Sequence, residues 1–207
     1  MHHENEISIT ASCLVANGSV YKDGIKKFTA EPVNLDKLLP SVYSYFGFRY
    51  PKFHKMDNLS KLGWLATEML LQGIDLAEKY PASGVGVVLS NANASLDTDR
   101  KYYDTVKDIP SPALFVYTLP NIVTGEICIR HRLKGENAFF VSESFDAPFI
   151  HQYVSNMINN DILQCCICGW VDVMGNDYKA ALFLVEKGQG NAFTVESINK
   201  IYALENG

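Results

Sequence analysis

The segment Phe139-Phe140-Val141-Ser142-Glu143-Ser144-Phe145-Asp146-Ala147-Pro148 decides how this chain folds. Residues 138–142 form a short apolar run that predicts a β-strand. Asp146 is a good N-cap, and Pro148 falls in the first turn of the following helix, where a missing N–H costs nothing. Apolar residues then recur at helical spacing, so the sequence predicts a strand, a tight elbow and a helix over 146–160.

The elbow between this strand and this helix carries Ser144. A helix that begins at such an elbow directs backbone N–H groups and the positive end of its dipole at the residue there, which is where an enzyme would hold a nucleophile. After the helix, residues 162–170 form a near-continuous apolar run, typical of a strand buried on both faces. Ser144 is therefore the candidate catalytic residue.

Strands and helices alternate along the rest of the chain. Apolar runs and helix signals predict strands at 6–16, 85–89 and 180–186 and helices at 57–80, 97–106 and 120–132. We expect a short helix at 35–39 within an otherwise irregular segment 24–50, an extended piece at 112–117, and a last strand or short helix at 193–203. Together they predict one α/β domain over 1–207, with a mixed, mostly parallel five-stranded sheet and helices on both faces.

Composition narrows the classes of function. The chain has 207 residues, of which 47% are hydrophobic and 20% charged, as in ordinary globular proteins. A net charge of −5 without a basic cluster argues against a nucleic-acid partner, and the apolar runs are too short to cross a membrane. The five cysteines lie mostly in apolar runs and the N-terminus lacks the apolar core of a signal peptide, so we expect reduced thiols and a cytoplasmic location.

The order of these elements resembles the N-terminal half of the β-ketoacyl-acyl-carrier-protein synthases, which have a thiolase-like fold. The first strand with Ala16-Asn17-Gly18 and the segment 85–95 are similar to the family's first strand with its turn and to its second strand with a small-residue loop. Gly169 stands where the family has the first glycine of its "aGG" strand end, and residues 177–187 resemble its "DGAgxlvLE". The most specific match is the spacing of Pro120, Asn121, Gly125, Ile127, Ile129, Leu133 and Gly135. The resemblance covers about residues 6–190 and implies a single thiolase-like half-domain.

The same resemblance places Ser144 at the position of the family's nucleophilic cysteine. The family has T-A-C-x-S there, whereas residues 142–146 read S-E-S-F-D. A helix N-terminus can lower the pKa of a thiol into the physiological range, but a serine hydroxyl needs an adjacent general base. The family's two histidines, or His and Asn, lie in a C-terminal half that we expect this chain to lack. We therefore expect Ser144 to be inactive.

The resemblance also implies where ligands would bind. Its binding positions are Ser90, Asn91, Asn121, Glu143 and Phe145, and it implies neither a cofactor nor a metal. His151 lies two helical turns along the helix, too far for a direct hydrogen bond to the elbow. Glu143 could act as the base, but we expect it instead to replace a buried small residue or to point to solvent. On a strand, Cys166 and Cys168 point to one face and Cys165 points to the other. We interpret all three as core residues rather than zinc ligands, because structural zinc needs C-x2-C pairs.

Three functions remain open. The favoured one is a non-catalytic, ketosynthase-like subunit or accessory protein of fatty-acid or polyketide assembly, which binds an acyl carrier protein or a full-length ketosynthase. The second is an acyltransferase or thioesterase that uses Ser144, and the third is an acyl-chain binding module. A lone half-domain leaves one sheet face uncovered unless polar residues of the 146–160 helix adapt it to water, and we expect a homodimer or heterodimer through the strand 138–142.

Overall fold

The structure is a computed structural model that describes residues 6–31 and 34–204. Residues 1–5, on which the expectation of no signal peptide falls, lie outside the described part. The strands are β1 (Ile7–Ala16), β2 (Ser19–Lys22), β3 (Ile25–Thr29), β4 (Val85–Asn91), β5 (Asn137–Val141), β6 (Cys165–Met174), β7 (Asp177–Lys187) and β8 (Asn191–Ala192). The α-helices are α1 (Leu35–Tyr45), α2 (Asn58–Leu70), α3 (Leu76–Lys79), α4 (Leu96–Val106), α5 (Pro112–Phe115), α6 (Ile122–His131), α7 (Ala147–Asn159) and α8 (Val195–Tyr202). The short 3₁₀ turns are η1 (Pro51–Lys55) and η2 (Ala82–Gly84).

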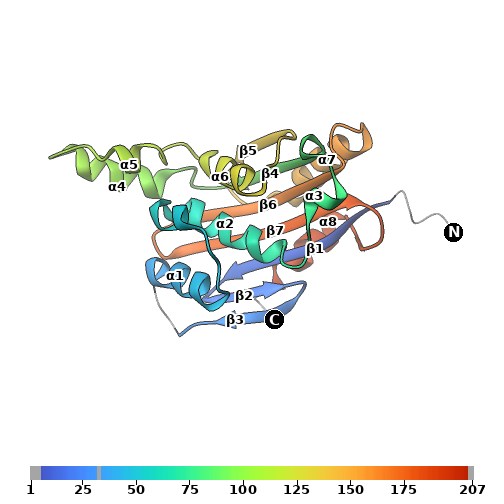
Figure 1. The fold of residues 1–207 in the computed structure, drawn as a ribbon, viewed down its shortest axis with the longest axis horizontal. Coiled ribbons are helices and arrows are strands. Elements are labelled where there is room, and N and C mark those ends of the chain that lie inside the picture. The colour runs from blue at the N-terminus through green and yellow to red at the C-terminus, as the bar shows by residue number, and fades with distance from the viewer. Residues whose placement is uncertain (1–5, 32–33, 205–207) are drawn as a thin grey trace.

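The described residues form one eight-stranded sheet in the order β3-β2-β1-β7-β6-β4-β5, with β8 paired to β1 (Figure 1). All five predicted strands are present as β1, β4, β5, β6 and β7, while the short strands β2, β3 and β8 were not predicted. The sheet is mixed, as predicted, but it is not mostly parallel. Only β4 pairs in parallel with β5 and β6, and the other pairs in the described part are antiparallel. Two of these antiparallel pairs, β1–β2 and β6–β7, are hairpins, and a tight turn can join only antiparallel strands.

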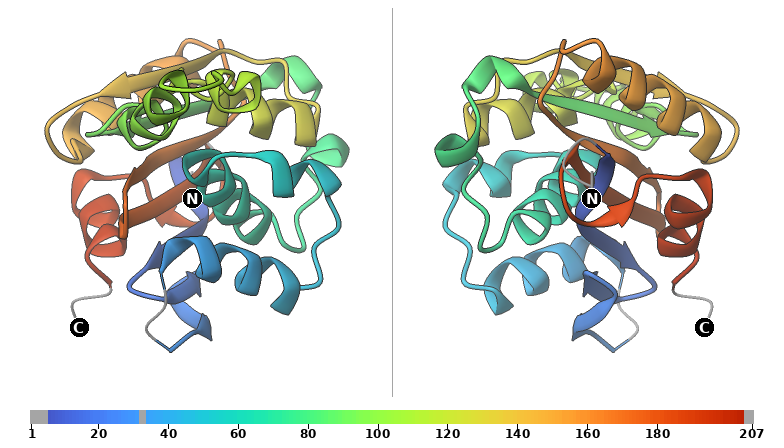
Figure 2. Two further views of the ribbon diagram at one scale, coloured as in Figure 1. Left: turned by 90° about the vertical axis from the view of Figure 1, so that its left-hand side faces the viewer. Right: turned by 90° about the vertical axis from the view of Figure 1, so that its right-hand side faces the viewer.

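Helices cover both faces of the sheet, as Figure 2 shows edge-on. Alternate residues of the central strands feed two separate cores, because side chains of a strand point to opposite faces. One core receives α1, α2 and α6 and is rich in aromatic rings around Trp64. The other receives α7 and α8. The three cysteines of β6 follow this alternation as predicted, with Cys165 in the first core and Cys166 and Cys168 in the second.

Three helical segments differ from the prediction. The helix predicted over 57–80 is broken into α2 and α3, because Gly73 adopts φ +81° and Asp75 caps a new helix by accepting from the Ala77 N–H at 2.9 Å. Residues 112–117 are not extended, since Ser111 caps the short helix α5. Within 24–50, a hairpin strand and a longer α1 replace the expected irregular segment.

The sheet face beside α7 is covered by the chain's own C-terminal helix. Phe193 and Ile198 are buried, and Ile201, Tyr202 and Leu204 are packed against the same core. None of the large apolar side chains that are exposed in the described part belongs to α7 or α8. Exposed positions of α7 include the polar residues Gln152 and Asn156. Of the two outcomes that the sequence leaves open, the described residues therefore agree with adaptation of this region to water, and α8 supplies further cover. Across residues 6–31 and 34–204, no helix is long and apolar enough to cross a membrane.

Candidate functional site

The elbow lies where two neighbouring parallel strands end. β5 ends at Val141, and the Ser142 N–H donates to the Asn91 carbonyl at the end of β4, at 3.0 Å. The carboxyl ends of adjacent parallel strands are the usual place for ligands in open α/β sheets. Asp146 caps α7 as predicted, because its carboxylate accepts from the Phe149 N–H at 2.9 Å. Ser144 lies exposed between these two anchored points.

Ser144 has no base to activate it within the described part of the chain. The Ser142 hydroxyl donates to the Ser144 carbonyl at 2.9 Å, and no hydrogen bond from a described residue reaches the Ser144 hydroxyl. Glu143 is exposed. The His151 ring packs 5.2 Å from the Phe193 ring, measured between centroids, so it is held beside the segment that leads into α8. The arrangement lacks the nucleophile–base contact that serine chemistry requires.

The other two described histidines lie on the opposite face of the sheet. His131 Nε2 is 3.2 Å from Glu68 Oε1, beside the Arg130 guanidinium that pairs with the same carboxylate. Although burial raises the pKa of Glu68, the hydrogen bonds from His131 and Arg130 outweigh it and hold that pKa below its usual value. His54 is exposed and packs edge-on against Tyr43 and Phe53 at the rim of the aromatic cluster. Both histidines therefore belong to helix packing rather than to the elbow.

Phe145 anchors the elbow by packing its ring against the core on the α7–α8 side of the sheet. Its ring stacks on Tyr202 of α8 with centroids 4.4 Å apart, and it also meets the rings of Trp170 and Phe183 at 6.0 Å and 6.4 Å. The Lys179 ammonium lies 3.9 Å from the centroid of the Tyr202 ring, close enough for a cation–π contact. This ring cluster turns Phe145 into the sheet and leaves Ser144 facing outward.

The C-terminal end of β4 carries two of the predicted binding residues, and both are used internally. Ser90 is buried and its hydroxyl donates to the Gly169 carbonyl at 3.3 Å. The Asn91 side chain accepts from the Ala94 N–H and donates to the Ala94 carbonyl, both at 2.9 Å, which closes the loop on itself. The structure thus brings Ser90, Asn91 and the elbow to one end of the sheet, with Ser90 and Asn91 acting as structural supports.

Asp172 is a residue at this end that the sequence analysis missed. Its carboxylate accepts from the Ala92 and Asn93 N–H groups at 3.2 Å and 3.0 Å and from the Asn93 side-chain amide at 2.8 Å. These are the donors that could have held an anionic group beside the elbow, and a protein carboxylate already fills them. No local pattern marks Asp172, because its partners lie about eighty residues earlier in the chain.

Asn121 is not brought to the elbow. It precedes α6 on the opposite face of the sheet, is exposed, and its side chain makes no capping hydrogen bond. Of the predicted site residues, Asn121 is therefore the one that the fold separates from Ser144.

Three surface grooves formed by described residues lie away from the elbow. A groove of about 490 Å³ runs between the edge of β1 and α8, another of about 470 Å³ surrounds Tyr80 and Glu186, and a third of about 410 Å³ lies beside α3. Ser144, Ser90 and Asn91 line none of these three.

The cysteines are free thiols in the core. Cys13, Cys165, Cys166 and Cys168 are buried and Cys128 is half-buried. Burial raises the pKa of Cys13 to about 12 and that of Cys128 to about 11, so both are neutral at physiological pH. Across the residues that the structure places, no three His, Cys, Asp or Glu side chains converge as metal ligands would.

Comparisons with known proteins identify the fold. No protein-family model matches the chain, and no curated protein matches its sequence. Among solved structures, a ketosynthase/chain length factor of ishigamide biosynthesis is similar with a TM-score of 0.61 at 18% identity, over 89% of this chain and 63% of that one. A chain of the ketosynthase ApeO in complex with its chain length factor ApeC, from Xenorhabdus doucetiae, matches with a TM-score of 0.59 at 10% identity, over 98% of this chain and 92% of that one.

A third solved structure is an acyl carrier protein in complex with its type II polyketide ketosynthase, AntDE:AntF. It matches with a TM-score of 0.57 at 15% identity, over 99% of this chain and 66% of that one. The chain thus spans about two thirds of the length of two of these relatives. These matches confirm the predicted ketosynthase-like, thiolase-type α/β fold.

Proposed function

We propose that this chain is a non-catalytic, ketosynthase-fold subunit that pairs with a complete ketosynthase in polyketide or fatty-acid assembly. The observation that carries the proposal is Ser144: it stands at the elbow where the ketosynthase resemblance puts the cysteine, and no described base contacts it. A serine hydroxyl at physiological pH is a weak nucleophile without such a base. Within the described residues, the ketosynthase-like fold is thus present while no base contacts the elbow serine, which supports a role without catalysis.

The partner is argued from the neighbours and from the sheet edge. Two of the similar structures are described as a ketosynthase with a chain length factor, and one as a ketosynthase with an acyl carrier protein. In this chain β5 is an edge strand, paired in parallel with β4 on one side, and Val141 at its end is 57% exposed. An unprotected edge strand is a template for pairing with another chain. A dimer across β5, with a ketosynthase as the other subunit and an acyl carrier protein as its client, fits these observations.

Neither alternative function has a structural observation in its favour. An acyltransferase or thioesterase needs a base at Ser144, and the nearest candidate, Glu143, is turned to solvent. An acyl-chain module needs a deep apolar channel beside the elbow, and the three grooves described above lie elsewhere.

A cytoplasmic location remains part of the proposal. Its support is the set of five unpaired cysteines, which suits a reducing compartment. In that compartment the chain would be accessible to the proposed ketosynthase and acyl carrier protein.

The test is intact-protein mass spectrometry of the co-purified pair after incubation with an acyl-loaded carrier protein. We expect an acyl adduct on the complete ketosynthase and none on this chain, and the same result with Ser144→Ala. An adduct on this chain that disappears in Ser144→Ala would make Ser144 a working nucleophile and overturn the proposal. Ser142→Ala serves as the matched control, because Ser142 lies at the same elbow but donates its hydroxyl to the backbone.

A further inference from the structure

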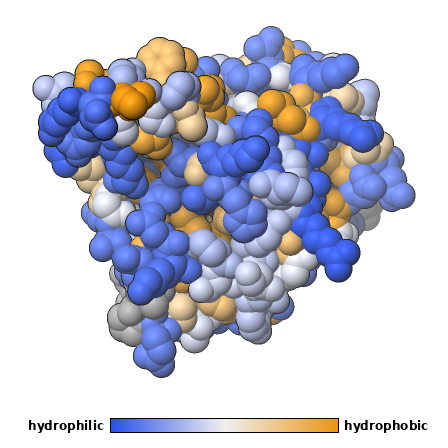
Figure 3. Space-filling view, turned by 60° about the vertical axis from the view of Figure 1, so that its left-hand side comes forward, coloured by the Kyte–Doolittle hydropathy of each residue, from blue (hydrophilic) through white to orange (hydrophobic). Residues whose placement is uncertain are grey.

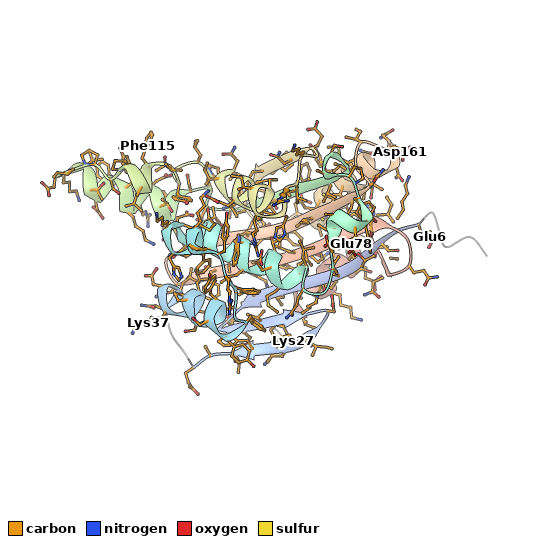
Figure 4. All side chains as sticks on the ribbon, in the orientation of Figure 1. Glu6, Lys27, Lys37, Glu78, Phe115 and Asp161 are labelled. Atoms are coloured by element: carbon orange, nitrogen blue, oxygen red, sulfur yellow. The ribbon has the colours of Figure 1, made fainter. Side chains whose placement is uncertain are left out.

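The border of the sheet opposite β5 carries a group of positive charges. β3 is the last strand on that side, and α1 lies near it at the lower end of the molecule (Figure 1). We call this region, from β3 through α1 to Arg49, the α1–β3 border. Its exposed basic side chains are Lys26 and Lys27 on β3, Lys37 on α1, and Arg49 shortly after α1. Figure 4 labels Lys27 and Lys37, which both lie on the lower border of the molecule.

These four charges have no carboxylate partner. Within the described part of the chain, no ion pair or hydrogen bond engages a side-chain nitrogen of Lys27, Lys37 or Arg49, and the Lys26 ammonium only lies over the Tyr21 ring at 5.3 Å. By contrast, exposed lysines elsewhere are paired with carboxylates: Lys79, Lys101, Lys107 and Lys187. The charges of the α1–β3 border are therefore free to attract an anionic surface.

Two exposed apolar side chains lie among these charges. Outside residues 96–141, two of the three exposed large apolar side chains in the described part are Ile25 and Tyr45, both on this border. Tyr45 is 65% exposed, and its ring is held by Phe28 at 5.0 Å and by Phe46 at 4.9 Å, measured between centroids. Figure 3 shows hydrophilic groups with a few hydrophobic ones between them at the lower end of the molecule. The border thus combines free cations with an aromatic ring in a fixed position.

The charge of the rest of the molecule orients this border. The whole chain has a net charge of −5, but residues 25–49 carry four basic side chains and two acidic ones. Of those two, Asp36 already accepts from the Asn58 side-chain amide at 2.8 Å, while Glu31 is exposed. Since the remainder of the chain is acidic, an anionic surface attracts this border and repels the rest of the molecule.

A lipid surface fits this border better than a folded acidic protein does. A protein interface is centred on anchoring side chains that fill well-packed pockets. Neither Lys27 nor Tyr45 lines any of the three grooves described above. The headgroup layer of a membrane needs no such pocket, because it attracts free lysines and arginines and holds the amphipathic ring of tyrosine at its boundary with the acyl chains.

We propose that the α1–β3 border docks this chain on an anionic phospholipid surface. The four free basic side chains face the headgroups, and Tyr45 and Ile25 enter the interface between them. The contact is peripheral, since it uses exposed side chains of a folded border. β3 and β5 stand at opposite ends of the strand order, so the inference does not depend on the pairing proposed at β5 and leaves that edge free.

The test is co-sedimentation of the purified chain with vesicles of phosphatidylcholine, alone or with about 30% phosphatidylglycerol, at about 0.05 M and about 0.5 M salt. We expect binding only to the anionic vesicles, and its loss at the higher salt because screening weakens attraction between exposed charges. Lys27→Gln with Lys37→Gln should bind about 25-fold more weakly, since each basic residue near an anionic surface contributes about fivefold. Tyr45→Ser should weaken binding without changing its dependence on salt.

The matched control is Lys107→Gln with Lys134→Gln, which changes the net charge equally at two exposed lysines away from the border. It should bind the anionic vesicles within about twofold of the wild type, because these lysines do not face the lipid. Thermal unfolding of each variant checks that the fold is kept.

Three results would overturn the inference. One is a wild-type chain that does not bind anionic vesicles at the lower salt, or that binds neutral vesicles equally well. Another is equal binding by the wild type and the Lys27 and Lys37 variant, or an equal loss in that variant and in the control. The third is binding to a purified acyl carrier protein but not to vesicles, lost in the Lys27 and Lys37 variant, which would assign the border to an acidic protein.

Discussion

At Ser144 the chain has the geometry of a nucleophile elbow but a side chain that is a weak nucleophile without a base. The elbow, the capping carboxylate of Asp146 and the inward ring of Phe145 build the same strand–helix junction that could present a nucleophile. With a thiol there, the helix end alone would favour the thiolate; with a hydroxyl it cannot generate an alkoxide. In the proposal, the identity of this one atom separates a partner subunit from a catalytic one.

Buried thiols give the chain a measurable pH dependence. Burial raises the pKa of Cys13 from 9.0 to about 12, so the neutral thiol is favoured in the folded state. A raised pKa contributes stability that is fully present below the unfolded value near 9.0 and is lost as pH rises toward 12. We expect the free energy of unfolding to fall by about 1.4 kcal/mol per pH unit from this group across that window.

The measurement is urea unfolding at several pH values between 8.5 and 11 for the wild type and Cys13→Ala. The variant is less stable throughout because it leaves a small cavity, but its slope against pH should be shallower by the contribution of one thiol. Equal slopes would show that Cys13 ionises as easily in the folded chain as in the unfolded one.

Residue-level predictions were good where the signal is local. Asp146 as the cap of α7 and Cys166 and Cys168 on one face of β6 follow from neighbours in sequence, and the structure has both. Asp172 could not be predicted, since its role depends on a loop that the sheet brings beside it from far along the chain. The internal role of Asn91 could not be predicted either. An asparagine that binds a ligand and one that hydrogen-bonds to the Ala94 backbone look the same in the sequence.

At the scale of elements, the long apolar strands were predictable and the short ones were not. β4 and β6 are apolar over almost their whole length, and a continuous apolar run of this kind is typical of a strand that is buried on both faces. β3 alternates little and carries two lysines, as exposed edge strands do, so its pattern resembles a loop. The sequence analysis predicted too many parallel strand pairs. It relied on the alternation of helices and strands and gave too little weight to the tight turns after β1 and β6, which make the strands on either side antiparallel.

Gly169 gives a sharp test at this scale. It lies in the middle of β6 with φ +140°, and a Cβ placed there would be 2.0 Å from the Ala181 carbonyl oxygen of β7. Backbone strain and overpacking each cost about 1–3 kcal/mol, so we expect Gly169→Ala to lower the free energy of unfolding by about 3 kcal/mol or more.

The matched control is Gly125→Ala in α6, where the added Cβ meets nothing within 4 Å. That change should be neutral or stabilise the chain by up to about 1 kcal/mol, since alanine is the better helix former. Both are read from urea unfolding curves. Gly169→Ala with wild-type stability would contradict the described pairing of β6 with β7.

At the scale of the whole molecule, α8 determines which surface of the chain is covered. A half-domain of this fold could have left the α7 face bare, but α8 packs there and its Tyr202 ring stacks on the elbow residue Phe145. The sequence left residues 193–203 open between strand and helix, and so did not show this cover. With that face covered, most of the large apolar side chains that are exposed in the described part lie between Leu96 and Val141, and Val141 stands at the β5 edge where the proposal places the partner.

The most direct test of the central claim is the molar mass of the complex. The chain, 23.1 kDa, is co-expressed with each complete ketosynthase of the same organism and analysed by size-exclusion chromatography with light scattering. The account predicts that one ketosynthase elutes with this chain at the summed mass of one copy of each. Elution of the chain as a separate 23.1 kDa species beside every ketosynthase would contradict it.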